Sequence, residues 1–261
     1  MSAAPHRKVR TERIGADGAI QLITIDRPER RNAIDTETAW GISAALDELD
    51  TDRDLRLGIL TGAGGTFCAG MDLAAFLAGE RPSVGRRGFA GVVEAPPEKP
   101  LIAAVEGAAV AGGFEIVLAC DLVVAASDAR FGLPEVRRGL VAGGGGLMRL
   151  ARRAPFHLAM EWALTGEFVA ARRAAEVGLV NRVTEPGGAL AAAVELAEQI
   201  AANGPLALAA TKRVLTECQD WSRNEEFERQ RAITEPVRDS ADAREGALAF
   251  REKRAPRWTG R

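Results

Sequence analysis

Residues 100–120 read PLIAAVEGAAVAGGFEIVLAC, and this stretch decides the fold class. The apolar run 101–105 predicts a short buried strand. A glycine turn follows, and the apolar run near 113–120 predicts a helix. A strand, a turn and a helix in direct succession are typical of α/β architectures.

The same alternation extends in both directions along the chain. Residues 7–13 and 19–25 flank a Gly15-Ala16-Asp17-Gly18 turn and predict a hairpin. Residues 78–98 are rich in glycine, proline and charge, so we expect a mobile surface segment that acts as a lid. The other expected elements are a helix at 36–50 capped by Asp35 and Thr36, strands at 56–61, 121–126 and 179–184, helices near 145–152, 156–164 and 170–177, and helix from about 187 to the end.

The composition of the 261 residues, 47% hydrophobic and 27% charged, is that of a globular protein with a sizeable core. A formal net charge of −2 gives no reason to expect nucleic-acid binding. No apolar run approaches the ~20 residues that span a membrane, and the first residues lack an apolar signal-peptide core. We therefore expect a cytoplasmic protein. Its three cysteines form no CxxC pair and are expected to be reduced and packed: Cys68, Cys120 and Cys218.

The residue types that are missing narrow the chemistry. The sequence has no tyrosine and two histidines, His6 near the terminus and His157 beside Pro155, and neither has metal-ligand spacing. Serine and cysteine nucleophiles usually need a histidine base, and no GxSxG motif is present. The glycine clusters at 62–65, 112–113 and 143–146 match neither a P-loop nor a dinucleotide fingerprint. Proton chemistry therefore falls to carboxylates, lysines or backbone groups.

Glu115 is the first candidate for this chemistry. The glycines just before its helix leave backbone N–H groups bare at the positive end of the helix, which stabilises an anion. A glutamate in a first turn is often only a surface charge, but the apolar neighbours Phe114 and Ile116 favour burial. A buried glutamate with no arginine or lysine within four residues has a raised pKa, which suits general acid–base catalysis.

Two further segments have a similar form. The segment 67–72 (FCAGMD) follows the strand at 56–61 and offers another turn with exposed N–H groups. The segment 131–135 (FGLPE) places Glu135 directly after a proline, at a turn or a helix start. Taken alone, Glu135 is more often structural, so this pattern leaves its role open.

Together these segments resemble the enoyl-CoA hydratase/isomerase family, also called the crotonase family. The resemblance covers most of the chain, and the motifs occur in the family's order. The matching segments are Asp26-Arg27-Pro28 through Asn32-Ala33, FxAGxD at 67–72, PLIAAVEG at 100–107, AGGFE at 111–115, FGLPE at 131–135, GLVNRV at 178–183 and AFREKRAP at 249–256.

The resemblance implies an α/β fold. Residues 1–200 would form a spiral of strand–strand–helix (ββα) units that carries the active site. Residues 201–261 would form a C-terminal helical trimerisation region. The chain would assemble as a homotrimer or hexamer.

The resemblance also implies roles for individual residues. Glu115 and Glu135 would be the catalytic pair, the N–H groups of Met71 and Gly112 would form an oxyanion hole, and Gly143 would help to hold the catalytic water. No metal or separate cofactor is expected, since coenzyme A is part of the acyl-CoA thioester substrate. The residues similar to substrate-binding positions are Arg27, Arg30, Arg31, Ala33, Ala69, Asp72 and Leu73.

The sequence departs from the family's commonest pattern at three positions. Ala111 replaces the first of three glycines, Met71 stands where alanine is frequent, and Ala142 stands where proline is frequent. The oxyanion donors are backbone groups, so the first two changes should not abolish the hole, although Met71 would narrow the acyl pocket. The segments GFAG, AGGFE and LPE also look like the carnitinyl-CoA dehydratase branch.

The activity implied by the resemblance is that of an enoyl-CoA hydratase, a hydro-lyase that reversibly adds water to the 2,3 double bond of an enoyl-CoA thioester. The two glutamates favour hydration or dehydration over isomerisation, which family members can perform with one glutamate. Carnitinyl-CoA dehydratase and enoyl-CoA isomerase stay open as alternatives. An alternative of another class is a catalytically silent acyl-CoA-binding protein.

Overall fold

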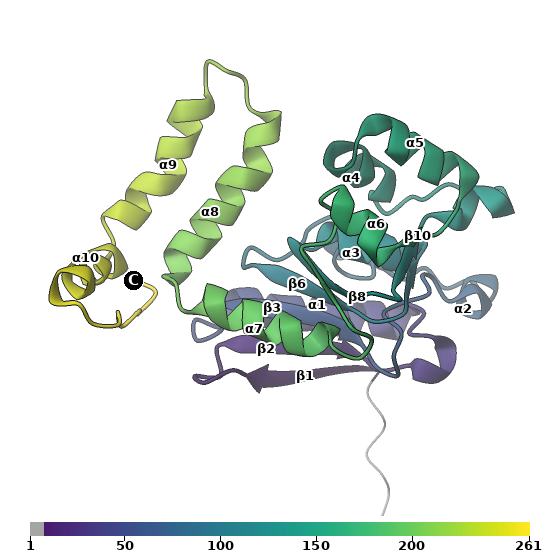
Figure 1. Cartoon of the computed structure of the whole chain (residues 1–261), viewed down its shortest axis with the longest axis horizontal. Helices are drawn as coiled ribbons and strands as arrows, with labels where there is room; N and C mark the ends of the chain where they lie inside the picture. Colours follow the sequence, from purple (N-terminus) through teal and green to yellow (C-terminus); the bar gives the residue numbers. More distant parts are fainter. Residues whose placement is uncertain (1–7) are drawn as a thin grey trace, which may run out of the picture.

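The computed structural model describes residues 8–261 and, within them, places six strands in one central sheet (Figure 1). The strand order is β1-β2-β3-β6-β8-β11. Antiparallel pairing joins β1 (Val9–Ile14) to β2 (Ile20–Ile25), which confirms the predicted hairpin. His6 and Arg7 lie outside the described residues. The other strands run parallel to β2 and to one another: β3 (Leu57–Gly62), β6 (Leu101–Val105), β8 (Leu122–Ala126) and β11 (Arg182–Thr184).

Side chains of the sheet pack into two apolar layers, one on each face, because successive residues of a strand point to opposite faces. Ile20 and Leu22 of β2 pack on one face, with Ile102 and Ala104 of β6. Helix α7 (Ala189–Ala201) covers this face through buried alanines at every fourth position. The opposite face lies beneath α1 (Thr36–Thr51) and α3 (Gly112–Ala119). The central strands β2, β3, β6 and β8 are buried on both faces, which explains why they are mostly apolar, whereas the edge strand β1 is largely exposed and polar.

A second layer of short strands turns the chain into a spiral. Ile34 bridges Met71, Cys68 bridges Ala109, and β7 (Ala108–Val110) pairs in parallel with β9 (Arg130–Gly132). Each of these segments follows a strand of the central sheet and precedes a helix or a 3-10 turn. The predicted ββα spiral is therefore confirmed, and neighbouring turns of the spiral contact one another through backbone hydrogen bonds.

Helices α1, α4 (Gly146–Arg153), α5 (Phe156–Thr165) and α6 (Ala171–Glu176) agree with the predicted ranges, whereas no range was predicted for α2 (Leu73–Leu77) or for the 3-10 turns η1 (Pro28–Arg30) and η3 (Pro134–Arg138). Asp35 caps α1 by accepting the N–H of Thr38. The strand β10 (Val169–Ala170) adds to the second layer by antiparallel pairing with β9.

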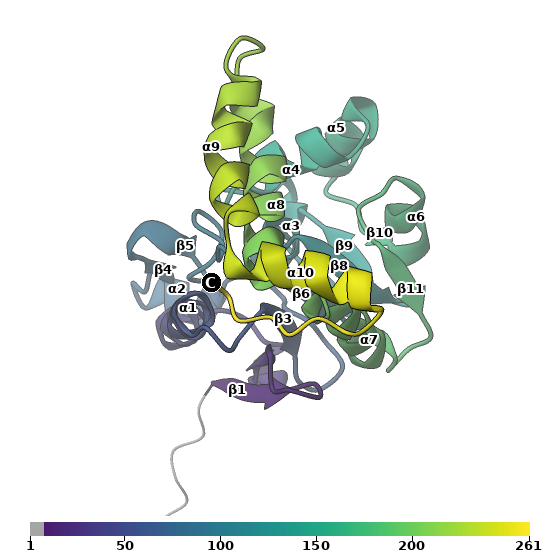
Figure 2. The same ribbon diagram turned by 90° about the vertical axis from the view of Figure 1, so that its left-hand side faces the viewer.

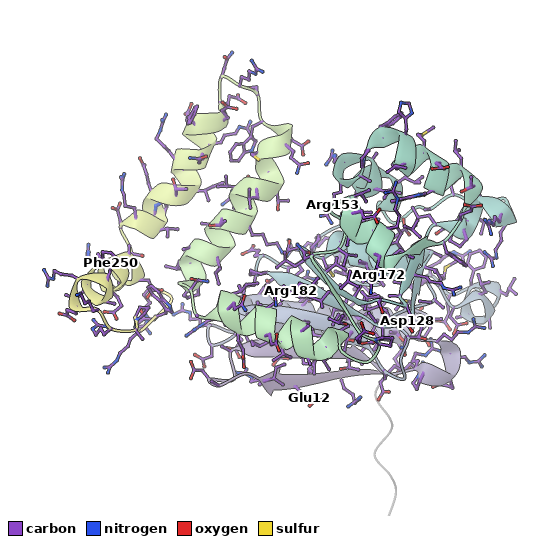
Figure 3. All side chains as sticks on the ribbon, in the orientation of Figure 1. Glu12, Asp128, Arg153, Arg172, Arg182 and Phe250 are labelled. Carbon is purple, nitrogen blue, oxygen red and sulfur yellow. The ribbon has the colours of Figure 1, made fainter. Side chains whose placement is uncertain are left out.

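The chain after α7 extends away from the sheet (Figures 1 and 2). It forms α8 (Pro205–Glu217), the 3-10 turn η4 (Cys218–Asp220), α9 (Glu226–Arg238) and α10 (Ala241–Glu252). The tail folds back, and Trp258 Nε1 donates a hydrogen bond to the carbonyl of Ala202. Phe250 on α10 is 88% exposed (Figure 3). Across residues 8–261, the helices include none with the length and apolar character needed to cross a membrane.

The expectation of a surface lid at 78–98 is wrong. The segment forms a small hairpin, β4 (Ser83–Val84) and β5 (Gly88–Phe89), around the 3-10 turn η2 (Gly85–Arg87). Val84 and Val93 belong to the main apolar core. Buried Arg87 donates hydrogen bonds to Asp47 and to the carbonyl of Ala95. A buried arginine that meets a helix thirty-seven to forty residues away gives no local sequence signal, which is why composition alone suggested a surface segment.

Ala111 is a strained residue at the start of α3. Its φ of 51° and ψ of −129° lie in a region that L-residues rarely adopt. Its Cβ would lie 3.0 Å from a Cβ placed on Gly70. We expect Ala111→Gly to raise the free energy of unfolding by about 1 kcal/mol, because relief of the strain outweighs the entropy that glycine adds to the unfolded chain. Urea denaturation measures this.

The matched control for this prediction is Ala109→Gly. Ala109 is fully buried in β7 and pairs with Phe131 without positive φ, so the same change there should destabilise by about 1 kcal/mol. If the two variants lose stability equally, the strain at Ala111 does not limit the fold.

Candidate active site

Glu115 lies in the first turn of α3 and is 4% exposed. Its Oε1 accepts hydrogen bonds from the backbone N–H groups of Gly144, at 2.7 Å, and Gly146, at 3.0 Å. Burial raises the pKa of the Glu115 carboxyl, while the two N–H groups and the charge of Arg149 oppose that rise. The predicted burial of Glu115 is confirmed, and the side chain is fixed by one oxygen.

Two glycines of the loop 143–146 must lack side chains for Glu115 to keep its place. A Cβ placed on Gly144 would lie 2.7 Å from Glu115 Oε2, and one on Gly146 would lie 2.7 Å from Glu115 Cγ. Gly143 is exposed, and a Cβ there would find nothing closer than 4.0 Å. The structure therefore assigns the contacts with Glu115 to Gly144 and Gly146. A role for Gly143 in holding a water stays a prediction.

Glu135 lies at the start of η3, directly after Pro134. Within the described part of the chain, its Oε2 is a buried oxygen without a hydrogen-bond partner. Burial raises the pKa of the Glu135 carboxyl, and the charge of Glu115 raises it further. Parallel pairing of β7 and β9 brings the two glutamates into one site, since each follows its strand. Because two nearby carboxylates do not easily both ionise, one can serve as base and the other as acid.

The segment just before Met71 lies against the start of α3, where Gly112 begins the helix. A Cβ placed on Gly70 would lie 3.1 Å from the Gly112 nitrogen, and one on Gly113 would lie 2.1 Å from the Cys68 carbonyl oxygen. Among residues 8–261, the N–H groups of Met71 and Gly112 donate no hydrogen bond. Two unpaired donors at the positive end of a helix suit a developing oxyanion.

Phe89 covers Gly112, one of the two backbone donors. A Cβ placed on Gly112 would lie 2.5 Å from the Phe89 ring, so the ring packs directly on the glycine. Phe89 is half-buried and reaches the site from the hairpin that follows α2. It thereby limits the space on one side of the oxyanion donors.

Several residues predicted to bind substrate are engaged with one another instead of being free. Buried Arg27 forms ion pairs with Asp35, at 3.1 Å, and Asp72, at 3.0 Å, and it donates to the carbonyl of Ala33. Asp72 also accepts the N–H groups of Ala74 and Ala75 and so caps α2. These contacts fix the chain on both sides of Met71.

The other predicted substrate positions have different exposures. Arg30, Arg31 and Leu73 are exposed, and Arg31 adopts a left-handed conformation after η1. Ala33 is buried and Ala69 is half-buried. Arg30, Arg31 and Leu73 can reach a ligand from solvent, and their contact with a substrate stays a prediction.

Within residues 8–261, no cysteine thiol and no imidazole donates a hydrogen bond to Glu115 or Glu135. Cys68 and Cys120 are buried, and burial raises the pKa of each thiol to about 12. Cys218 is exposed, so the prediction that all three are packed is wrong for this residue. His157 lies exposed on α5. Over residues 8–261, histidine, cysteine and carboxylate side chains form no group of three that could hold a metal ion.

Residues 15–261 match the model of the enoyl-CoA hydratase/isomerase family. The chain belongs to this family. It is 43% identical to enoyl-CoA hydratase EchA19 of Mycobacterium tuberculosis over 94% of each chain. It is 40% identical to the carnitinyl-CoA dehydratase of Proteus mirabilis, over 94% of this chain and 96% of the relative. A crystal structure of an enoyl-CoA hydratase from Mycobacterium tuberculosis is 56% identical, with a TM-score of 0.95 over 98% of this chain and 100% of that one.

Membership of the enoyl-CoA hydratase/isomerase family confirms the predicted crotonase fold and identifies the chain as an enzyme. Members of the family act on acyl-CoA thioesters. The hydratase and dehydratase relatives are hydro-lyases. Sequence reasoning missed Gly144, Gly146, Phe89 and Arg149 as parts of the site, because each meets its partner only in the folded chain. The glycine cluster 143–146 was the one available signal for two of them.

The geometry of the loop predicts that alanine substitution affects turnover very differently at the adjacent positions Gly143 and Gly144. We expect Gly144→Ala to lower turnover of an acyl-CoA thioester about 10- to 100-fold, because the new Cβ displaces the Glu115 carboxylate from its place. Gly143→Ala should leave turnover close to the wild-type value, since the space there is open. Steady-state kinetics of both variants, with melting temperatures as a check on folding, make the comparison. Equal losses in both variants would contradict the assigned geometry.

Proposed function

We propose that this enzyme is an enoyl-CoA hydratase, which reversibly adds water to the 2,3 double bond of an enoyl-CoA thioester. The observation that carries the proposal is the pairing of an anchored glutamate, Glu115, with Glu135, whose buried Oε2 has no partner in the described chain. A buried polar atom without a partner is costly and is expected where a ligand completes the site. A water or substrate group would complete this one.

The backbone donors of Met71 and Gly112 would bind the thioester oxygen. As negative charge develops on that oxygen, the two N–H groups stabilise the enolate, and each such donor is typically worth about 3 kcal/mol. This polarisation makes the β-carbon electrophilic. The positive end of α3 adds to the stabilisation.

The two glutamates would divide the proton transfers. Glu115, whose Oε1 accepts two N–H groups, is the better-stabilised anion and takes a proton from the attacking water. The water oxygen bonds to the β-carbon, and protonated Glu135 delivers its proton to the α-carbon. The reverse sequence removes water. No separate cofactor is needed in this scheme, and coenzyme A enters as part of the substrate.

The substrate would lie between the oxyanion donors and the exposed segment around Arg30. Arg30, Arg31 and Leu73 are exposed and available to the coenzyme A portion, while Arg27 and Asp72 hold the same segment in place from inside. Phe89 and Met71 would bound the acyl group. We place this reaction in the cytoplasm.

A second candidate is a carnitinyl-CoA dehydratase. Its support is the 40% identity to the Proteus mirabilis relative named for that activity. The same two glutamates would then eliminate water from a β-hydroxyacyl thioester that carries a cation.

Enoyl-CoA isomerase remains a further alternative, since it requires only one of the two carboxyls. A silent acyl-CoA-binding protein is disfavoured, because pure binding does not require two desolvated carboxyls.

The test follows the absorbance of the enoyl-thioester band with crotonyl-CoA and with longer trans-2-enoyl-CoA substrates. We expect rapid loss of the band in the wild type. Glu115→Gln and Glu135→Gln should each lower kcat about 100- to 10,000-fold, because each removes one proton-transfer group. Acyl-CoA binding, followed by thermal shift, should be retained in both variants. Wild-type rates in both would rule the assignment out, and activity only with a carnitinyl substrate would favour the second candidate.

The enzyme should assemble as a homotrimer or hexamer. Exposed apolar side chains gather between η3 and β10, among them Val141 at 74%, Leu164 at 66%, Met148 at 66% and Phe156 at 61%. Exposed large apolar side chains in this number suit an interface between subunits. Light scattering coupled to size exclusion should give three or six times the 27.7 kDa chain mass. A single-chain mass at micromolar concentration would contradict this expectation.

A further inference from the structure

Arg149 joins two segments that lie far apart in the sequence. From α4, its Nη2 donates a hydrogen bond to the carbonyl of Val93 at 2.5 Å, and its Nη1 reaches the carbonyl of Gly144 at 3.5 Å. A Cβ placed on Gly145 would lie 2.7 Å from Nη1, so the guanidinium packs against the loop itself. The Arg149 side chain therefore packs against the loop that holds Glu115 and contacts its backbone.

The contact with Val93 ties this loop to the other side of the site. Val93 is buried, and its N–H donates to the carbonyl of Phe89. Phe89 in turn packs on Gly112, one of the two unpaired backbone donors. Arg149 thus connects the support of Glu115 with the segment that covers Gly112.

Other carboxylates near Arg149 pair with neighbouring cations, and Glu115 is the carboxylate on which the Arg149 charge acts. Other cations near it have partners: Lys212 pairs with Asp121 at 2.6 Å, and Arg152 pairs with Asp220 at 3.6 Å. These four residues line, with Arg149, a cavity of about 720 Å³ between α4 and α8. Within residues 8–261, Arg149 has no carboxylate within 4 Å. Its charge acts on Glu115 across a greater distance.

The electrostatic effect of Arg149 has a definite sign. Its positive charge favours the ionised form of Glu115 and opposes the rise in pKa that burial causes. Glu135, on η3, is the other titratable group facing Glu115. Burial and the Glu115 charge raise the pKa of Glu135, and its own N–H and the charge of Arg138 oppose that rise. Cys120 and the cations Arg152 and Arg153 also influence Arg149 itself.

We infer that Arg149 is a positioning residue for the proposed hydration, holding the loop 144–146 and keeping Glu115 as the ionised base while Glu135 carries the proton. The inference rests on the proposed function for its kinetic consequences, but its effect on Glu115 is independent of any substrate. A role of Arg149 confined to global stability would lower the melting temperature without changing how Glu115 titrates.

Two variants distinguish the effect of the Arg149 charge from the effect of its hydrogen bonds. Arg149→Met removes the charge and both hydrogen bonds, and Arg149→Lys keeps the charge but not the two-pronged contact. Arg153→Met is the matched control, because Arg153 lies on the same helix and donates to the carbonyls of Leu118 and Cys120, away from the loop. Figure 3 shows Arg153 at the end of α4 that faces α8.

The kinetic test is the pH profile of hydration. We expect Arg149→Met to lower kcat roughly tenfold with little change in KM, since the loop loosens but the substrate is untouched. The acidic limb of the profile should move to higher pH, because Glu115 protonates more readily without the nearby charge. Arg149→Lys should restore the acidic limb and part of the rate. Arg153→Met should retain the wild-type profile.

A measurement without turnover keeps this inference separate from the proposed function. Carbon-13 NMR of enzyme labelled at the glutamate carboxyl, with Glu115→Gln for assignment, follows the titration of Glu115 directly. A higher Glu115 pKa in Arg149→Met, but not in Arg149→Lys or Arg153→Met, supports the inference even if no enoyl-CoA is hydrated. An unchanged Glu115 titration in Arg149→Met overturns it, whatever the rates are.

Discussion

The active site depends on a backbone contact that leaves no room for side chains. The segment that ends at Met71 lies against the start of α3 so closely that Gly113 faces the Cys68 carbonyl directly. This approach fixes the separation of the Met71 and Gly112 donors and the position at which α3 begins. Because α3 begins there, Glu115 falls one turn inside its positive end. A side chain at Gly113 would separate the two turns of the spiral. It would displace the backbone donors of Met71 and Gly112 and the Glu115 side chain at the same time.

The two glutamate carboxyl groups have different contacts, and these contacts suit one to act as base and the other as acid. Glu115 is bonded through one oxygen to two backbone donors and lies within the influence of a cation. Glu135 has a buried oxygen without a partner in the described chain and feels the negative charge of Glu115. Burial raises the pKa of both carboxyls and hydrogen bonds oppose that rise at both, but the donors at Glu115 are two loop N–H groups and the donor at Glu135 is its own N–H. The difference in supporting contacts, and not the residue type, separates base from acid.

The sequence was most informative where structure is local. The strand at 101–105, the glycine turn and the helix that follows lie where periodicity predicts them, and the apolar neighbours of Glu115 indicated its burial. The three-residue strands β7 and β9 are too short to give a periodic signal of their own. The ββα units also begin at uneven positions, 20, 57, 101 and 122, so no repeat is visible. The contacts of Glu115 with Gly144, and of Arg87 with Asp47, depend on tertiary folding and could not be predicted from spacing.

The way in which Glu115 is held has a stereochemical consequence. Its Oε1 is committed to two donors on the loop, so Oε2 is the oxygen that remains to bind and orient a water. In the proposed reaction the water would therefore approach a fixed enoyl group from one side only. The product would then be a single enantiomer at the β-carbon, selected through two glycine N–H groups that donate to the catalytic carboxylate.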